Sequence, residues 1–400
     1  MNRREMLAAL GLVTAGGVVG CSPLAATAAA GLTPPDPRKI FDVKAYGATG
    51  DGKTLDTPAI NRAIDACSSG GGGMVYVPPG TYLCGTIQLK SNVTLFLEAA
   101  AIIQGSSRSE DFGLMTGPPE QGDMNQRHVI FARDASNITL AGTGTIDGNG
   151  AAYWTQRARP ATDPWGDVAT YDYVASRRRP SPLLEFYNCT DLGIRGVHIR
   201  NAPGWTLRPI QCSNVFIDGI SIKNPIYGLN TDGIDVTCCK NVFISNCLIE
   251  TGDDTICLKS ESPYGGEPAV TKNVTITNCV LSCCCNGLKI GTATHGGFEN
   301  IVFSNSVIFN EDVPINQRVI GGVSLEVVDG GYIDGVLVSN IRMQRVRAPI
   351  FIRRGARKGP TDNKVNYLRG IMIENVHATG AIMTSSVTGL PGANVEDVTL

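Results

Sequence analysis

The sequence predicts an all-β fold: a single-stranded right-handed parallel β-helix with a short N-terminal helical cap. Short strand-like phrases that open with Asn recur along most of the chain, and from Asn214 to Asn300 they are spaced by 27, 32 and 27 residues. A period of about 20–50 residues indicates a solenoid or a propeller. A propeller blade needs four strands and about 40 residues, so a repeat this short favours the solenoid.

Each phrase alternates apolar and polar residues, which is the pattern of a half-buried strand. The clearest copies are residues 92–97, 137–140, 214–217, 241–244, 273–276 and 300–303. In a parallel β-helix each coil carries two or three such strands and stacks on the previous coil at about 4.8 Å. Asn suits the left-handed backbone of the turns, and we expect its side chains to form ladders between coils.

Residues 38–105 differ from this repeat and are expected to form the N-terminal cap and the first coils. The segment 56–67 predicts a helix, because Ile60, Ala63, Ile64 and Cys67 fall on one helical face. A solenoid needs a cap over its first coil, and a helix there would close it. Residues 106–400 are expected to form the β-helix itself, with the catalytic coils at 225–292.

Residues 1–30 predict an export signal. Arg3 and Arg4 precede an apolar run, as in the twin-arginine signals of bacterial export, and the run is too short to span a membrane. Val18-Val19-Gly20-Cys21 resembles a lipobox, in which Cys21 is lipidated; the alternative is ordinary cleavage after residues 28–30. We therefore expect an exported protein without a transmembrane span, either periplasmic, lipid-anchored to the bacterial envelope at Cys21, or extracellular.

Composition excludes several other classes of function. The chain has 34 basic and 36 acidic residues, so no basic excess exists to bind nucleic acid. Of the 13 cysteines none forms a CxxC pair, which argues against a zinc site. Apart from Cys21 they are expected to be small buried thiols stacked in the core, although an exported protein could oxidise some of them. We expect a monomer with no cofactor and no metal.

The densest polar cluster is Asn230-Thr231-Asp232-Gly233-Ile234-Asp235, followed by Gly252-Asp253-Asp254. Asp232 and Asp253 are 21 residues apart, close to one coil, so we expect them at matching places on adjacent coils. Hydrolysis of a glycosidic bond needs two carboxyl groups, one to protonate the leaving oxygen and one to activate water or attack carbon.

Adjacent Asp253 and Asp254 would repel each other if both were ionised, which can raise one pKa and keep a proton available. One coil of rise plus a sideways offset fits the separation of about 6.5–9.5 Å in inverting enzymes. The alternative is that these Asp-Gly and Asp-Asp pairs are ordinary solvated turns.

Over residues 40–355 the chain resembles glycoside hydrolase family 28, the polygalacturonases. Asn230-Thr231-Asp232 and Gly252-Asp253-Asp254 match two of the four short signatures of that family, and Gly204-Trp205-Thr206-Leu207 and Thr255-Ile256-Cys257-Leu258-Lys259-Ser260 match flanking phrases. The resemblance implies that Asp253 is the general acid and that Asp232 and Asp254 activate water for inversion. The substrate it implies is a pectic polysaccharide or oligosaccharide, with Asn230 and Asp235 as expected contacts.

Two phrases depart from the family pattern. The Gly-His-Gly phrase falls on Cys285-Asn286-Gly287, and the Arg-Ile-Lys phrase falls on Ser324-Leu325-Glu326. The cations of the second phrase bind a galacturonate carboxylate in ordinary polygalacturonases. Their loss puts plain endo-cleavage of polygalacturonate in doubt and favours exo action or a branched or rhamnogalacturonan substrate. The expected substrate-binding residues are Asn286, Glu326 and the replacement cations Arg208, Lys259, Lys289 and Arg353.

Two other functions stay open at this point. A β-helix polysaccharide lyase would abstract a proton with Lys or Arg, usually with calcium, and would leave an unsaturated product that absorbs ultraviolet light. A non-catalytic glycan-binding β-helix would bind sugar without releasing reducing ends. The three aspartates and the absence of an evident basic catalyst favour the hydrolase.

Overall fold

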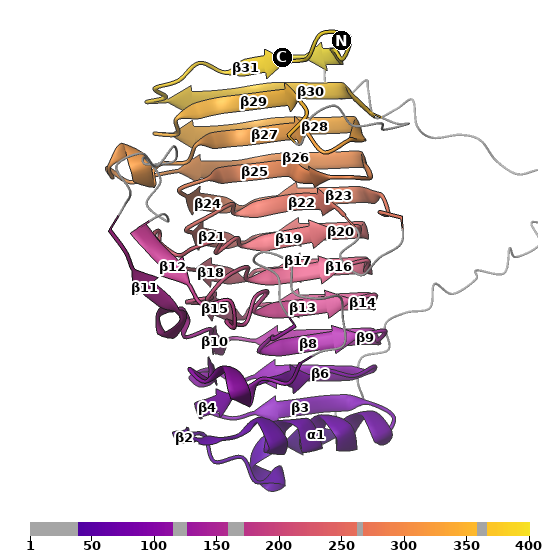
Figure 1. The fold of residues 1–400 in the computed structure, drawn as a ribbon. Coiled ribbons are helices and arrows are strands. Elements are labelled where there is room, and N and C mark those ends of the chain that lie inside the picture. The colour runs from indigo at the N-terminus through magenta and orange to yellow at the C-terminus, as the bar shows by residue number, and fades with distance from the viewer. Residues whose placement is uncertain (1–38, 115–125, 159–171, 262–266, 358–365) are drawn as a thin grey trace, which may run out of the picture. The chain divides into compact units, whose positions relative to one another are not determined.

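The coils of the chain contribute strands to three parallel ladders, which run side by side along the stack of coils (Figure 1). The computed structural model describes residues 39–114, 126–158, 172–261, 267–357 and 366–400. The export signal predicted at 1–30 and its Cys21 lie outside the described residues. Within them, no helix is long and apolar enough to cross a membrane.

The first ladder begins beside the cap and continues to the last strand of the chain. Its strands are β1 (Ile40–Asp42), β3 (Gly73–Val77), β6 (Val93–Leu97), β9 (Ser136–Gly142), β14 (Thr190–Arg195), β17 (Ser213–Asp218), β20 (Lys240–Ser245), β23 (Thr271–Thr277), β26 (Gly297–Phe309), β28 (Gly331–Gln344), β30 (Asn366–Thr379) and β32 (Val395–Thr399).

The second ladder joins the first at the long strand β26, which pairs with both β23 and β24. Its strands are β2 (Asp51–Leu55), β4 (Gly80–Cys84), β7 (Ala101–Gly105), β10 (Thr145–Asp147), β15 (His198–Arg200), β18 (Ser221–Lys223), β21 (Leu248–Thr251) and β24 (Val280–Cys283).

The third ladder carries the candidate site. Its strands are β5 (Ile87–Gln88), β8 (Ile130–Arg133), β13 (Leu184–Tyr187), β16 (Leu207–Ile210), β19 (Ile234–Thr237), β22 (Ile256–Ser260), β25 (Asn286–Thr294), β27 (Gly321–Val327), β29 (Ala348–Arg354) and β31 (Ser386–Thr388). Strands β11 (Trp154–Gln156) and β12 (Tyr173–Ala175) form a separate antiparallel pair. The predicted parallel β-helix is confirmed.

Helix α1 (Thr57–Ser69) packs against β1 and β3 at the N-terminal end of the stack (Figure 1). Ile60, Ala63, Ile64 and Cys67 are fully buried on its inner face, so the predicted helix is confirmed. It begins one residue later and ends two residues later than the sequence pattern indicated. Short 3-10 helices lie at Val43–Tyr46, Ser109–Asp111, Gly150–Tyr153 and Ile315–Gln317.

The core lies inside the coils and is built from aligned apolar residues. Val215, Val242 and Val274 occupy one register position on three successive coils, and all are buried. The twelve cysteines after Cys21 are free thiols, and all are buried except the half-buried Cys285. Cys212 accepts a hydrogen bond from the Cys189 backbone at 3.4 Å, so thiols stack between coils as expected.

Asn side chains form the predicted ladders at the turns. Asn241 has a left-handed φ of 57°; its amide donates to Asn214 at 3.0 Å and its oxygen accepts from Asn273 at 2.9 Å. Few residues besides Gly and Asn tolerate this backbone conformation. Of these two, only Asn has a side chain that can both donate and accept a hydrogen bond. The ladder therefore links the turns of successive coils.

We expect Asn241→Ala to lower the free energy of unfolding by about 1–3 kcal/mol, because Ala loses two hydrogen bonds and strains the left-handed backbone. Asn241→Gly should cost less, since Gly removes only the hydrogen bonds. Urea denaturation of the two variants measures this difference. Equal costs would show that backbone conformation contributes nothing at this turn.

Candidate active site

The three candidate aspartates precede strands of the third ladder on two adjacent coils. Ile234 pairs with Ile256, and the Gly233 backbone donates to the carbonyl of Asp254 at 2.9 Å. Asp232 is therefore level with Asp254. The expectation that Asp232 matches Asp253 was wrong by one residue, because the coil is one residue longer than the spacing suggested. Asp253 therefore lies one residue before the position that is level with Asp232.

Two glycines of the motifs are required by close packing of the turns. A Cβ atom on Gly233 would lie 2.4 Å from the carbonyl oxygen of Thr255, and one on Gly252 would lie 2.5 Å from that of Gly228. Both distances are far below van der Waals contact. These glycines let the two aspartate-bearing turns stack at the spacing of one coil.

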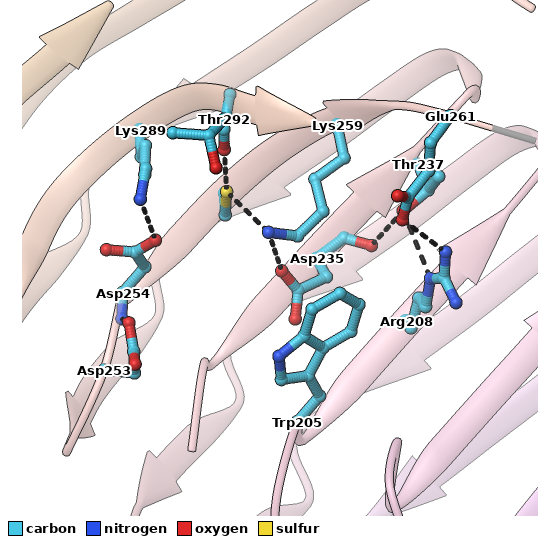
Figure 2. A network of polar contacts seen from close by, with 12 residues as sticks. Trp205, Arg208, Asp235, Thr237, Asp253, Asp254, Lys259, Glu261, Lys289 and Thr292 are labelled. Carbon is cyan, nitrogen blue, oxygen red and sulfur yellow. Dashed lines mark hydrogen bonds and ion pairs between the residues drawn. The ribbon is translucent and has the colours of Figure 1, made fainter. Parts of the chain in front are cut away.

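Asp254 is held by donors from the next coil. Lys289 Nζ lies 3.1 Å from Asp254 Oδ2, as Figure 2 shows. The backbone and side-chain amides of Asn286 donate to Asp254 Oδ1 at 3.0 Å and 2.6 Å. Ser324 in turn donates to Asn286 Oδ1 at 2.6 Å. Asn286 and Ser324 thus fix the orientation of the Asp254 carboxylate.

Asp253 is half-buried beside this carboxylate. Its Oδ1 accepts a hydrogen bond from the Asp254 backbone at 2.8 Å. Burial, followed by the charge of Asp254, raises the pKa of Asp253 to about 6. A carboxyl group that holds its proton to this pH can act as a general acid.

Asp232 is almost fully buried, with 3% of its surface exposed. Its Oδ1 makes no hydrogen bond to the described residues. Burial raises the pKa of Asp232 well above the usual range, and the nearby charges of Asp235 and Asp253 raise it further. Lys259 opposes this shift.

The structure buries three of the predicted substrate-binding residues. Lys259 Nζ lies 3.3 Å from Asp235 Oδ1, and the two side chains are only 9% and 0% exposed. Arg208, with 1% of its side chain exposed, is paired with Glu261 at 2.9 Å and with Glu185 at 3.5 Å. None of the three predicted residues lines the cavity described next.

Six predicted site residues meet at a cavity of about 630 Å³. They are Asp253, Asn230, Asn286, Lys289, Glu326 and Arg353. Burial raises the pKa of Glu326, which is level with Arg353 on the next coil. No hydrogen bond or ion pair within the described residues holds the Arg353 guanidinium, in contrast to Lys289. Arg353 is therefore the cation most available to a carboxylate in this cavity.

Sequence reasoning missed several residues that line the same cavity, among them Phe351, Arg357, Thr292 and Met383. Phe351 is level with Ser324, and Arg357 pairs with Asp329 and donates to Thr292 at 2.6 Å. Alignment of the later repeats with the third ladder could have identified Phe351, because it occupies the same register position as Ser324 on the next coil. Nothing in the local sequence of Met383 signals the site, because it lies between β30 and β31, far along the chain from the aspartate motifs.

A metal site was not expected. The side-chain ligand atoms of Asp253, Asp254 and Cys285 do lie within 4.8 Å of one another. Lys289 already supplies a positive charge to Asp254, which opposes a cation at that carboxylate. The absence of a metal requirement stays a prediction.

Comparison with known proteins identifies the family. The model of glycosyl hydrolases family 28 matches residues 67–395. A probable polygalacturonase from Vitis vinifera is 28% identical over 366 residues, which cover 86% of this chain and 70% of the relative. An exo-poly-alpha-D-galacturonosidase from Dickeya chrysanthemi is 25% identical over 350 residues, covering 77% and 56%.

A hyperthermoactive exopolygalacturonase from Thermotoga maritima has a similar crystal structure, with a TM-score of 0.74, 25% identity, and coverage of 91% of this chain and 86% of that one. The family match spans most of the chain and includes both aspartate signatures. The chain therefore belongs to glycosyl hydrolase family 28, and it is a polygalacturonase-like glycosidase on a right-handed parallel β-helix.

Proposed function

We propose that the enzyme hydrolyses α-glycosidic bonds of a galacturonate-containing pectic polysaccharide with inversion. The observation that supports this best is a carboxyl group with a raised pKa at the cavity, Asp253, next to the buried and paired carboxylate of Asp254. Asp253 has a raised pKa, whereas Asp254 is held beside it by Lys289 and Asn286. A carboxyl group that keeps its proton near neutral pH suits the acid role, and a carboxylate held by an ammonium and two amides suits the base role.

In the proposed reaction Asp253 donates its proton to the glycosidic oxygen as the bond to the anomeric carbon breaks. Asp232 and Asp254 take a proton from a water molecule, and its oxygen attacks the anomeric carbon from the opposite face. The proton taken by the base balances the proton given by Asp253, and the new hydroxyl has the inverted configuration.

The substrate is proposed to be a branched or rhamnogalacturonan fragment, or a chain end cut by exo action. Ser324 and Glu326 stand where the family pattern has two cations. Lys289 is paired with Asp254, so Arg353 is the remaining candidate for a uronate carboxylate. Relatives named as exo-acting enzymes agree with exo action but describe those proteins only. The same relatives lend no support to a lyase or to a non-catalytic binding protein.

We expect the first product released to have the inverted anomeric configuration. Direct attack by water gives inversion, whereas a glycosyl intermediate on an aspartate gives retention. Proton NMR in the first minutes of reaction, before the product mutarotates, distinguishes the two. Retention would make one aspartate a nucleophile and would reject the proposed mechanism.

We also propose that the enzyme acts as a monomer outside the cytoplasm, with Cys21 as the lipid attachment site. The support is the pattern of residues 1–30. Mass spectrometry of the mature N-terminus separates lipidation at Cys21 from cleavage after residues 28–30, and size-exclusion chromatography tests the monomer.

A further inference from the structure

A buried ion pair lies close to the three candidate aspartates, Asp232, Asp253 and Asp254, but does not line the cavity. Lys259 on β22 points to Asp235 on β19, and the indole of Trp205 lies against its ammonium (Figure 2). The ammonium is 4.6 Å from the centre of the Trp205 ring and 3.3 Å from Cys257 Sγ. Neither oxygen of Asp235 makes a hydrogen bond of normal geometry within the described residues. The charge of Asp235 is therefore balanced mainly by Lys259.

This pair is close to Asp232 by two independent routes. Asp235 follows Asp232 by three residues, where the turn enters β19. Trp205 is level with Asp232, because Leu207 pairs with Ile234 and the Thr206 backbone donates to the Asp232 carbonyl at 2.9 Å. The side chain that contacts Lys259 thus lies one coil from the Asp232 position.

We propose that Asp235 and Lys259 are positioning residues that control the charge of Asp232 and do not contact the sugar. The inference rests on the proposed role of Asp232 as a base. An aspartate this deeply buried retains its proton unless a positive charge compensates it. Lys259 supplies a charge that opposes this effect of burial, and Asp235 and Trp205 hold it in place.

Among the charged groups around the pair, Lys259 is the cation that acts on the pKa of Asp232. Asp232 faces the acidic groups Asp235, Asp253 and Asp254, and Lys259 is the cation that favours its ionised form. Asp235 also faces Arg208 and Asp254, and Lys259 also faces Cys257 and Asp254. The charge of Arg208 is largely taken up by its ion pairs with Glu185 and Glu261.

Two single substitutions should move the pH profile in opposite directions. A base must be deprotonated, so protonation of Asp232 contributes to the fall of kcat/KM at low pH. Lys259→Met removes the compensating charge and should shift this acid limb to higher pH. Asp235→Asn leaves Lys259 without its partner and should shift it to lower pH. One nearby charge moves a carboxyl pKa by about 1–3 units, so shifts of about one pH unit or more are expected.

The double variant Asp235→Asn/Lys259→Met should return the acid limb toward its wild-type position, since both charges are gone. Lys259→Arg keeps the charge and should keep the acid limb even if the rate falls. Arg369→Met, which breaks the surface ion pair with Asp334 at 2.7 Å, is the matched control and should leave the profile unchanged. Thermal unfolding of each variant is measured in parallel.

Shifts in the same direction, or no shift in either single variant, would overturn the inference, because a purely structural pair lowers the amount of active enzyme without opposing effects on the profile. If Lys259→Met fails to fold, Asp235→Asn and Lys259→Arg still test it through the predicted downward shift and the retained limb. Failure of the proposed function is a different result: wild-type enzyme that releases no reducing sugar from any pectic fragment, or Asp232→Asn that keeps full activity.

Discussion

Replacement of Asp253 by Asn is expected to reduce hydrolysis by about 10²–10⁴-fold, the usual contribution of general acid catalysis. The amide has nearly the same size and can still accept the hydrogen bond from the Asp254 backbone, but it has no proton to deliver to the leaving oxygen. The fold should therefore survive while the rate falls. Initial rates of reducing-sugar release from a pectic fragment, with thermal unfolding of the same sample, measure both effects.

Asp334→Asn is the control for this substitution, since Asp334 is a partly exposed carboxylate on β28 that is paired with Arg369. It should leave the rate unchanged. An Asp253→Asn enzyme that keeps more than about a tenth of the wild-type rate would exclude Asp253 as the general acid.

Plain polygalacturonate is expected to be a poorer substrate than a branched or rhamnose-containing fragment, by about a hundredfold in kcat/KM. The resemblance places two cations at Ser324 and Glu326, and we expect Glu326 to add repulsion against a uronate carboxylate. At about 4 Å and partly screened, exchange of attraction for repulsion changes binding by several kcal/mol. A kinetic comparison of homogalacturonan with rhamnogalacturonan I and II fragments tests this.

The structure reduces the competing explanation to one residue. Lys259 is buried, Lys289 is paired with Asp254, and Arg357 is paired with Asp329. This leaves Arg353 at the cavity to replace the lost cations. If polygalacturonate is turned over as fast as the branched fragments, the prediction fails, and Arg353→Ala should then lower the activity on polygalacturonate. Glu326→Lys restores a family cation and should raise activity on polygalacturonate, whereas Ile315→Ala, an exposed change outside the cavity lining, should not.

The repeat and the motifs determined much of this protein without its structure. Apolar residues at strand spacing specify a stacked coil, because a single coil cannot bury its own apolar face. The same logic identified α1, whose buried face recurs at helical spacing. Asp232, Asp253 and Asp254 could be proposed as catalytic from the sequence, because each lies in a short local motif that can be recognised without the structure.

Only the tertiary structure decided how those residues face one another. Register along the third ladder made Asp232 level with Asp254 instead of Asp253, since the length of a coil depends on how its turns pack and not on the spacing of the motifs. Burial also separated cations that look alike in sequence. Lys259 is enclosed with Asp235, Lys289 is paired with Asp254, and Arg353 remains at the cavity. The exposure and the ion pairs of these side chains depend on neighbours one coil away, about 20–35 residues distant in the chain. Such contacts cannot be inferred from a local sequence pattern.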